Sequence, residues 1–184
     1  MVKNISGIWC GEMSFDEDHY EQEFERMLNL EYERKFFIRK SKDIFKIRRF
    51  ISKGNDSLMI AKLIKDSDRS SKESWTITVC YYSMLYLAKA AILERGYETD
   101  DHYATQIALG HLLVPGKIEA EDLRTLEQTH RIFEEDYVEY FDDARRESSL
   151  SRYSPTKVYS ERRANEVFGN ATGFIAKLST IIDS

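Results

Sequence analysis

The segment from Trp75 to Leu93, WTITVCYYSMLYLAKAAIL, constrains the fold of this chain more than any other. Lys89 is its only charged residue, and its apolar and aromatic side chains leave no wide polar face. A helix of this kind needs protein contacts on nearly all sides. Its length approaches the roughly 20 residues of a membrane span, but Lys89, two threonines and three tyrosines argue against lipid. We therefore predict the central helix of a soluble bundle, with no membrane partner.

Composition favours an all-α fold. Of the 184 residues, 42% are hydrophobic, which is enough for one sizeable core. The chain has only two prolines and eight glycines, so long helices are favoured over a fold with many turns. We predict an antiparallel bundle of four to five helices over residues 41–184, preceded by an N-terminal helical extension over residues 1–40.

Charge, cysteine content and missing motifs exclude several functional classes. The formal net charge of −5 excludes a uniformly basic nucleic-acid-binding protein but not a local basic patch. Cys10 and Cys80 are far apart, which favours a reducing compartment and argues against a zinc site. The sequence has no Gly-rich phosphate loop, H-E-x-x-H motif or EF-hand spacing. With no signal-peptide pattern either, we expect a cytoplasmic protein without a metal or cofactor.

Charge is segregated in the N-terminal third. Residues 16–33 are acid-rich, whereas residues 34–53 carry many Lys and Arg residues with one acid, Asp43. Phe37, Ile44, Ile47 and Ile51 recur at helical spacing and predict a basic amphipathic helix, interrupted at Gly54 and Asn55 before a shorter helix ending near Lys65. The cationic face either contacts RNA phosphates or anionic lipid, or it is a solvated face that the preceding acidic helix or a second subunit partly neutralises.

Three further helices follow the central one. Thr99, Asp100 or Asp101 caps a short helix that Pro115 and Gly116 end. A long helix begins near Ala120, with a seam that alternates steps of three and four: Leu123, Leu126, His130, Phe133, Tyr137, Tyr140 and Ala144. A serine-rich loop from Arg146 to Pro155 separates it from a last helix, whose apolar face holds Val167, Ala171, Phe174 or Ile175, Leu178 and Ile181.

Three features together resemble a known family. They are the tyrosine-rich string YYSMLYLAKAAILERGYE, His102 at a helix start, and a long helix ending in ARRESSLSRY. This arrangement resembles the HEPN superfamily of prokaryotic helical-bundle proteins over roughly residues 54–182. The resemblance implies a bundle that is usually dimeric and often acts as a metal-independent ribonuclease.

The resemblance also implies where the chemistry would lie. Active members have an arginine and a histidine with four to six residues between them, which come together across the dimer. The histidine can serve as acid or base, and the arginine stabilises the phosphate. Arg145 or Arg146 matches the arginine, but no histidine follows, and Tyr153 occupies the nearest comparable position. Tyrosine, with a pKa of about 10, is a poor general base near neutral pH. We therefore expect weak or absent ribonuclease activity, with Arg145, Arg146 and Tyr153 at the site.

Two other arginine–histidine pairs satisfy the same loose spacing. Arg124 and His130 are six residues apart on one helix, so they point about 120° away from each other. His130 also lies on the apolar seam, which favours a packed or interface histidine. His102, after Arg95, is either a first-turn surface residue or a secondary catalytic candidate, because it matches the family pattern.

A group of cations surrounds the serine-rich loop: Arg145, Arg146, Arg152, Lys157, Arg162 and Arg163. Such a patch on an acidic protein suits a phosphate, which two arginines can grip together. The alternative is ion pairing with the neighbouring acids Glu134, Glu135, Asp142 and Asp143.

Two functional classes follow from these features. One is an RNA- or nucleotide-interacting HEPN protein, a toxin-like partner of a small nucleotidyltransferase, with Tyr153 as a target of modification. The other is a non-catalytic dimerising scaffold. In both cases the long seam and the resemblance lead us to expect a homodimer.

Overall fold

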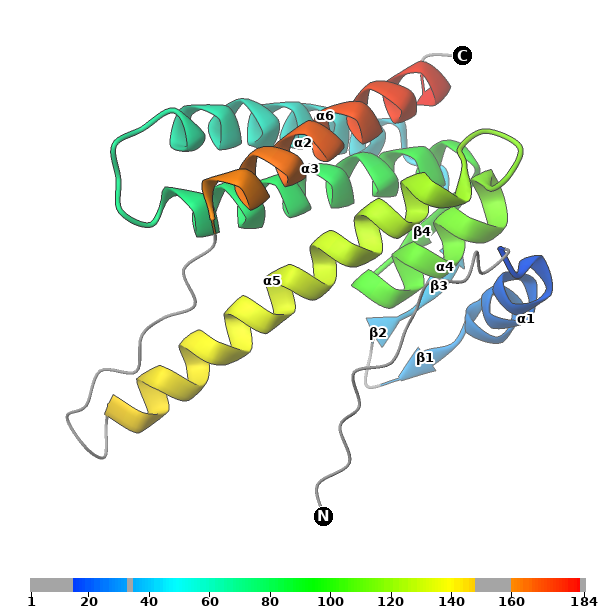
Figure 1. Cartoon of the computed structure of the whole chain (residues 1–184). Coiled ribbons are helices and arrows are strands. Elements are labelled where there is room, and N and C mark those ends of the chain that lie inside the picture. Colours follow the sequence, from blue (N-terminus) through cyan, green and yellow to red (C-terminus); the bar gives the residue numbers. More distant parts are fainter. Residues whose placement is uncertain (1–14, 33–34, 148–159, 183–184) are drawn as a thin grey trace.

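The computed structural model describes residues 15–32, 35–147 and 160–182, and within them it is a helical bundle (Figure 1). Side chains of α5 are described as far as Glu134. The helices are α1 (Glu17–Met27), α2 (Ile44–Lys65), α3 (Lys72–Glu94), α4 (His102–Leu113), α5 (Ala120–Glu147) and α6 (Glu161–Ile182). The strands are β1 (Glu31–Tyr32), β2 (Lys35–Phe36), β3 (Ile38–Lys40) and β4 (Tyr97–Thr99). The prediction of an all-α helical bundle is confirmed.

The predicted central helix is α3, and it occupies the middle of the bundle. It forms an antiparallel hairpin with α2, α6 lies alongside, and α5 crosses them obliquely (Figure 1). Thirteen of its 23 residues are buried, among them Tyr81, Met84 and Leu87. By length and composition α3 is the one helix of the described ranges that could cross a membrane, yet most of it is buried inside the bundle. Protein contacts on all sides explain its apolar sequence.

Gly54 does not interrupt the basic helix, so the prediction of two helices there is wrong. α2 runs unbroken from Ile44 to Lys65, with Gly54 on its buried face. A Cβ atom at Gly54 would collide with the Leu87 side chain, and Ser83 Oγ donates a hydrogen bond to the Gly54 carbonyl oxygen over 2.6 Å. The glycine therefore serves the close approach of α2 to α3 rather than a helix end.

The N-terminal region is helical only in part, since short strands follow α1. β3 pairs with β4 in antiparallel register, with Ile38 opposite Thr99, and β1 pairs with β2. The basic helix predicted from residue 34 therefore begins later, at Ile44, where the Asp43 side chain accepts a hydrogen bond from the Lys46 amide. Pairing with β4 satisfies the backbone hydrogen-bonding groups of Ile38–Lys40, so these residues do not need a helix to satisfy them.

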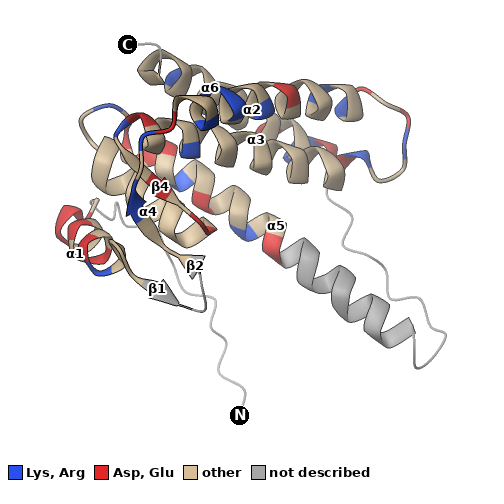
Figure 2. Cartoon of the chain, turned by 180° about the vertical axis from the view of Figure 1, so that it is seen from behind, with Lys and Arg blue, Asp and Glu red and all other residues tan. Residues whose placement is uncertain are grey.

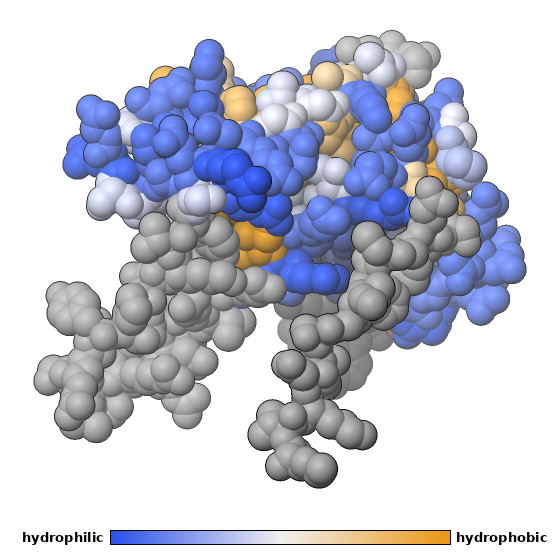
Figure 3. Space-filling view, in the orientation of Figure 1, coloured by the Kyte–Doolittle hydropathy of each residue, from blue (hydrophilic) through white to orange (hydrophobic). Residues whose placement is uncertain are grey.

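The remaining helices agree with the predictions. Asp101 is the cap of α4, since its side chain accepts a hydrogen bond from the Ala104 amide over 2.7 Å. The predicted apolar face of α6 is buried. Lys and Arg residues recur along α2 and acids along α1 (Figure 2). The face shown in Figure 3 is largely hydrophilic, with a few apolar patches.

Candidate functional site

Two histidines and a tyrosine meet where α3, α4 and α5 pack together. Gly96, with a φ of 87°, ends α3 and turns the chain into β4, and α4 then begins at His102. This return path places His102 against Tyr81 in the middle of α3. His130, on the inner side of α5, completes the group. Residues distant in sequence thus form one histidine–aromatic cluster, defined as Tyr81, His102, His130 and Phe133.

Most ring pairs of this cluster are stacked, and the Tyr81–His130 pair is tilted. The His102 and His130 ring centroids are 4.8 Å apart with an interplanar angle of 20°, and those of Tyr81 and Phe133 are 5.1 Å apart. The Tyr81 hydroxyl is hydrogen-bonded to Nδ1 of His102. On the solvent side, His130 Nε2 lies 3.4 Å from Oε1 of Glu134, which makes an ion pair when the ring is protonated. The cluster is therefore a packed unit with one polar edge.

Burial sets the protonation of the cluster. It raises the pKa of Tyr81 well above its usual value, so the hydroxyl keeps its proton near neutral pH. Burial, together with the neighbouring His130 and Lys89, lowers the pKa of His102. A neutral ring that accepts the tyrosine hydrogen at Nδ1 carries its own hydrogen on Nε2. In that tautomer, Nε2 of His102 is a hydrogen-bond donor.

Lys89, the single charged residue between Trp75 and Leu93 of α3, adds a cation beside the cluster. Its ammonium donates a hydrogen bond to the Asp100 carbonyl oxygen over 2.8 Å, and burial lowers its pKa. Two imidazoles next to an ammonium are groups that can exchange protons and attract a phosphate. The described residues contain no group of three or more His, Cys, Asp or Glu side chains that could hold a metal ion. The two imidazoles make acid–base chemistry available at this cluster.

Most of the predicted site lies outside the described residues. Arg145 and Arg146 are in the last turn of α5, where side chains are not described, and Arg152, Tyr153 and Lys157 lie between Glu147 and Ser160. Only the last two cations of the predicted patch are placed. Arg162 is exposed in the first turn of α6, and Arg163 lies 3.1 Å from Glu166. Ion pairing within one helix therefore applies to one of these two arginines.

The contact between His102 and His130 was not predicted from the sequence. We expected His130 to be a packed histidine, and it does pack, against His102 and Tyr81. Arg124 interacts instead with Glu121 one turn away, at 2.8 Å. The sequence carried one signal: His102 lies at a predicted helix start, and His130 lies on the predicted apolar seam of the long helix. Ring pairing across three helices depends on their packing angles, which periodicity does not give.

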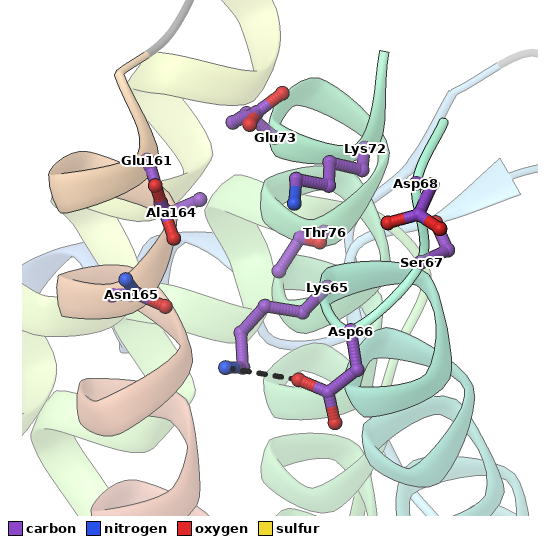
Figure 4. Close-up of a pocket in the computed structure, with 10 residues that line it drawn as sticks. All are labelled: Lys65, Asp66, Ser67, Asp68, Lys72, Glu73, Thr76, Glu161, Ala164 and Asn165. Carbon is purple, nitrogen blue, oxygen red and sulfur yellow. Dashed lines mark ion pairs between the residues drawn. The ribbon is translucent and has the colours of Figure 1, made fainter. Parts of the chain in front are cut away.

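A separate polar hollow of about 280 Å³ lies between the end of α2 and the starts of α3 and α6 (Figure 4). Its lining carries both signs of charge, from Lys65 and Lys72 on one hand and from Glu73 and Glu161 on the other. Thr76, at the bottom, is fully buried, and its hydroxyl has no hydrogen-bond partner within the described ranges. The hollow suits a small polar molecule better than an apolar one.

Comparison with known proteins identifies the family. The family model described as HEPN domain matches residues 47–181, which is well over half of the chain. The matched region begins in α2 and ends at the last turn of α6, so it covers α3, α4, α5 and the histidine–aromatic cluster but not α1. A search of curated proteins finds no match. With a model match of this extent, the chain belongs to the HEPN domain family.

Proposed function

We propose that this HEPN protein binds RNA or a nucleotide through phosphate groups, and that it cleaves RNA weakly or not at all. The observation that carries the proposal is the exposed basic start of α6, where Arg162 extends into solvent. Arg163 follows it, and the amide of Arg163 donates to Ser160 Oγ at the helix cap. The start of a helix favours anions, and arginines add bidentate donors for phosphate.

The absence of a histidine close after Arg145 and Arg146 supports weak cleavage. Efficient proton transfer near neutral pH contributes roughly 10² to 10⁴ to the rate of such reactions. His102 is instead hydrogen-bonded to the Tyr81 hydroxyl within the histidine–aromatic cluster. Binding requires only the cations, so it survives without that transfer.

A second candidate function is metal-independent RNA cleavage at His102 and His130. Their stacking at 4.8 Å, next to Lys89, favours it. Two adjacent imidazoles can divide the roles of general base and general acid, and His130 lies beside Glu134. In this case cleavage resists EDTA and is lost in His102→Gln and His130→Gln.

The family membership also motivates two proposals on partners. The protein acts as the toxin-like partner of a small nucleotidyltransferase, with Tyr153 as the modified residue, and it functions in the cytoplasm as a homodimer. The alternative is a dimerising scaffold without catalysis. A nucleotidyltransferase reading frame next to this one supports the first, and a partner that binds without RNA supports the second.

Fluorescence anisotropy with a labelled single-stranded RNA and with a labelled nucleotide tests the main proposal. We expect Arg145→Ala with Arg146→Ala to weaken binding by about tenfold or more, in line with the loss of charged contacts. Arg69→Ala removes an exposed arginine from the α2–α3 loop and is the matched control, which leaves binding unchanged. Equal loss in both variants contradicts a local site, and efficient EDTA-resistant cleavage contradicts the prediction of weak activity.

A further inference from the structure

The polar hollow between α2, α3 and α6 contains a buried hydroxyl group that the described residues leave without a hydrogen-bond partner (Figure 4). This hydroxyl belongs to Thr76, which is fully buried and lines the hollow. Other threonines in the helices bond locally: Thr125, Thr129 and Thr172 each donate to the carbonyl oxygen four residues earlier, over 3.0, 2.8 and 2.8 Å. A buried hydroxyl without a partner costs free energy, so Thr76 favours a ligand that hydrogen-bonds to it.

Positive charge gathers on the α3 side of the hollow. Lys72 in the first turn of α3 is half-buried, and its ammonium group lies above Thr76 in the view of Figure 4. Lys65 is already paired with Asp66 at 3.3 Å, whereas Lys72 makes no ion pair with another described residue. α3 also begins here without a side-chain cap, since Ser71 makes no capping hydrogen bond. Because a helix start carries partial positive charge, this side of the hollow suits a carboxylate.

Negative charge predominates around the rest of the hollow. Its lining holds two lysines and four acids: Lys65, Lys72, Asp66, Asp68, Glu73 and Glu161. Glu161 and Asn165 belong to α6 and lie across the hollow from Lys72 (Figure 4). The excess of carboxylates disfavours a simple anion such as phosphate, and Lys72 at the start of α3 disfavours a simple cation. Charges of both signs on opposite walls therefore favour a zwitterion.

We propose that the hollow binds a free amino acid, with its carboxylate at Lys72 and Thr76 and its ammonium group at Glu161. The volume of the hollow is about 280 Å³, below the roughly 300–1,000 Å³ of pockets for drug-sized ligands. A small molecule with one carboxylate and one ammonium group fits both this volume and the charges. The inference goes beyond RNA binding, because Arg162 and Arg163 are not among the lining residues.

Ligand-detected NMR with the full chain tests the proposal, with the standard amino acids offered one at a time at millimolar concentration. Isothermal titration calorimetry then gives the affinity of the amino acid that binds. We expect its N-acetyl and amide derivatives, each of which lacks one charge, to bind about tenfold or more weakly. Inorganic phosphate and putrescine serve as the plain anion and the plain cation, and both should also bind more weakly.

Three variants test whether the amino acid lies in the hollow. Thr76→Val keeps the shape of the side chain and removes the hydroxyl, and it should weaken binding about fivefold. Lys72→Gln and Glu161→Gln each remove one charge and should weaken binding about tenfold or more. Lys62→Gln is the matched control, because Lys62 is exposed on α2 outside the lining, and it should bind as the wild type does.

The melting temperature of the free protein separates ligand loss from misfolding. Thr76→Val removes a buried hydroxyl without a partner, so its melting temperature without ligand should equal or exceed that of the wild type. Three results overturn the inference. They are no binding of any amino acid at millimolar concentration, phosphate or putrescine binding as tightly as the amino acid, and an affinity that Thr76→Val, Lys72→Gln and Glu161→Gln leave unchanged.

Discussion

Replacing Gly54 by alanine is the sharpest test of how α2 packs against α3. The added methyl group meets the side chain of Leu87, which is fully buried, and lies 3.2 Å from the Ser83 carbonyl oxygen. Either Leu87 leaves its position or the two helices move apart. Movement of the helices also stretches the hydrogen bond that Ser83 Oγ donates to the Gly54 carbonyl oxygen.

Two opposing effects determine the size of the change. Inserting a methyl group into a packed core costs about 1–3 kcal/mol. Alanine in place of glycine inside a helix stabilises it by about 0.8–1.0 kcal/mol. The first effect is the larger here, because the neighbours are a buried side chain and a backbone oxygen. We expect Gly54→Ala to lower the free energy of unfolding by up to about 2 kcal/mol, the difference between the two effects.

Gly169→Ala is the matched control. Gly169 lies in the interior of α6 and is exposed, and a Cβ atom there meets nothing within 4 Å. Only the helix-propensity gain applies, so this variant should be more stable by about 0.5–1 kcal/mol. Urea unfolding followed by circular dichroism measures both changes. Stabilisation of similar size in the two variants would refute the account of the α2–α3 contact.

Further predictions concern the histidines and the ion pair of α5. His102 has a lowered pKa when folded, so the unfolded chain binds the proton more readily, and stability should fall as pH decreases below about 6.5. His102→Gln should flatten this dependence in urea unfolding at several pH values, whereas His19→Gln, at an exposed position of α1, should leave it unchanged. Asp122 of α5 accepts hydrogen bonds from Lys177 and from the Glu119 amide. Asp122→Ala should therefore destabilise the protein by about 1–2 kcal/mol. An unchanged melting temperature would contradict this prediction.

The helices could be predicted because apolar periodicity reports directly on packing. In α3 the apolar residues surround the helix, and in α6 they form a single face, which the structure buries as predicted. The error at Gly54 arose because glycine ends helices and also allows helices to approach each other, and sequence alone does not separate these roles. The strand β3 was missed because its partner β4 is 59 residues away at the Arg39–Glu98 pair.

The candidate site was less predictable than the fold. Capping by Asp101 indicated that His102 begins a helix, but not that it would meet Tyr81 and His130. Such contacts depend on how three helices cross, and the crossing is set by many side chains together. Arg145, Arg146 and Tyr153 stay predictions, since their side chains lie outside the described residues.

The salt dependence of RNA binding tests the central claim most directly. If several of the arginines around the end of α5 and the start of α6 contact phosphates, the logarithm of the association constant for RNA falls linearly with the logarithm of salt concentration. For single strands the slope is about −0.7 for each contact. We predict a slope of about −2 or steeper for the wild-type protein, and a shallower one for the Arg145→Ala, Arg146→Ala variant. Binding that is independent of salt, or no RNA and nucleotide binding at low salt, would contradict the proposed function.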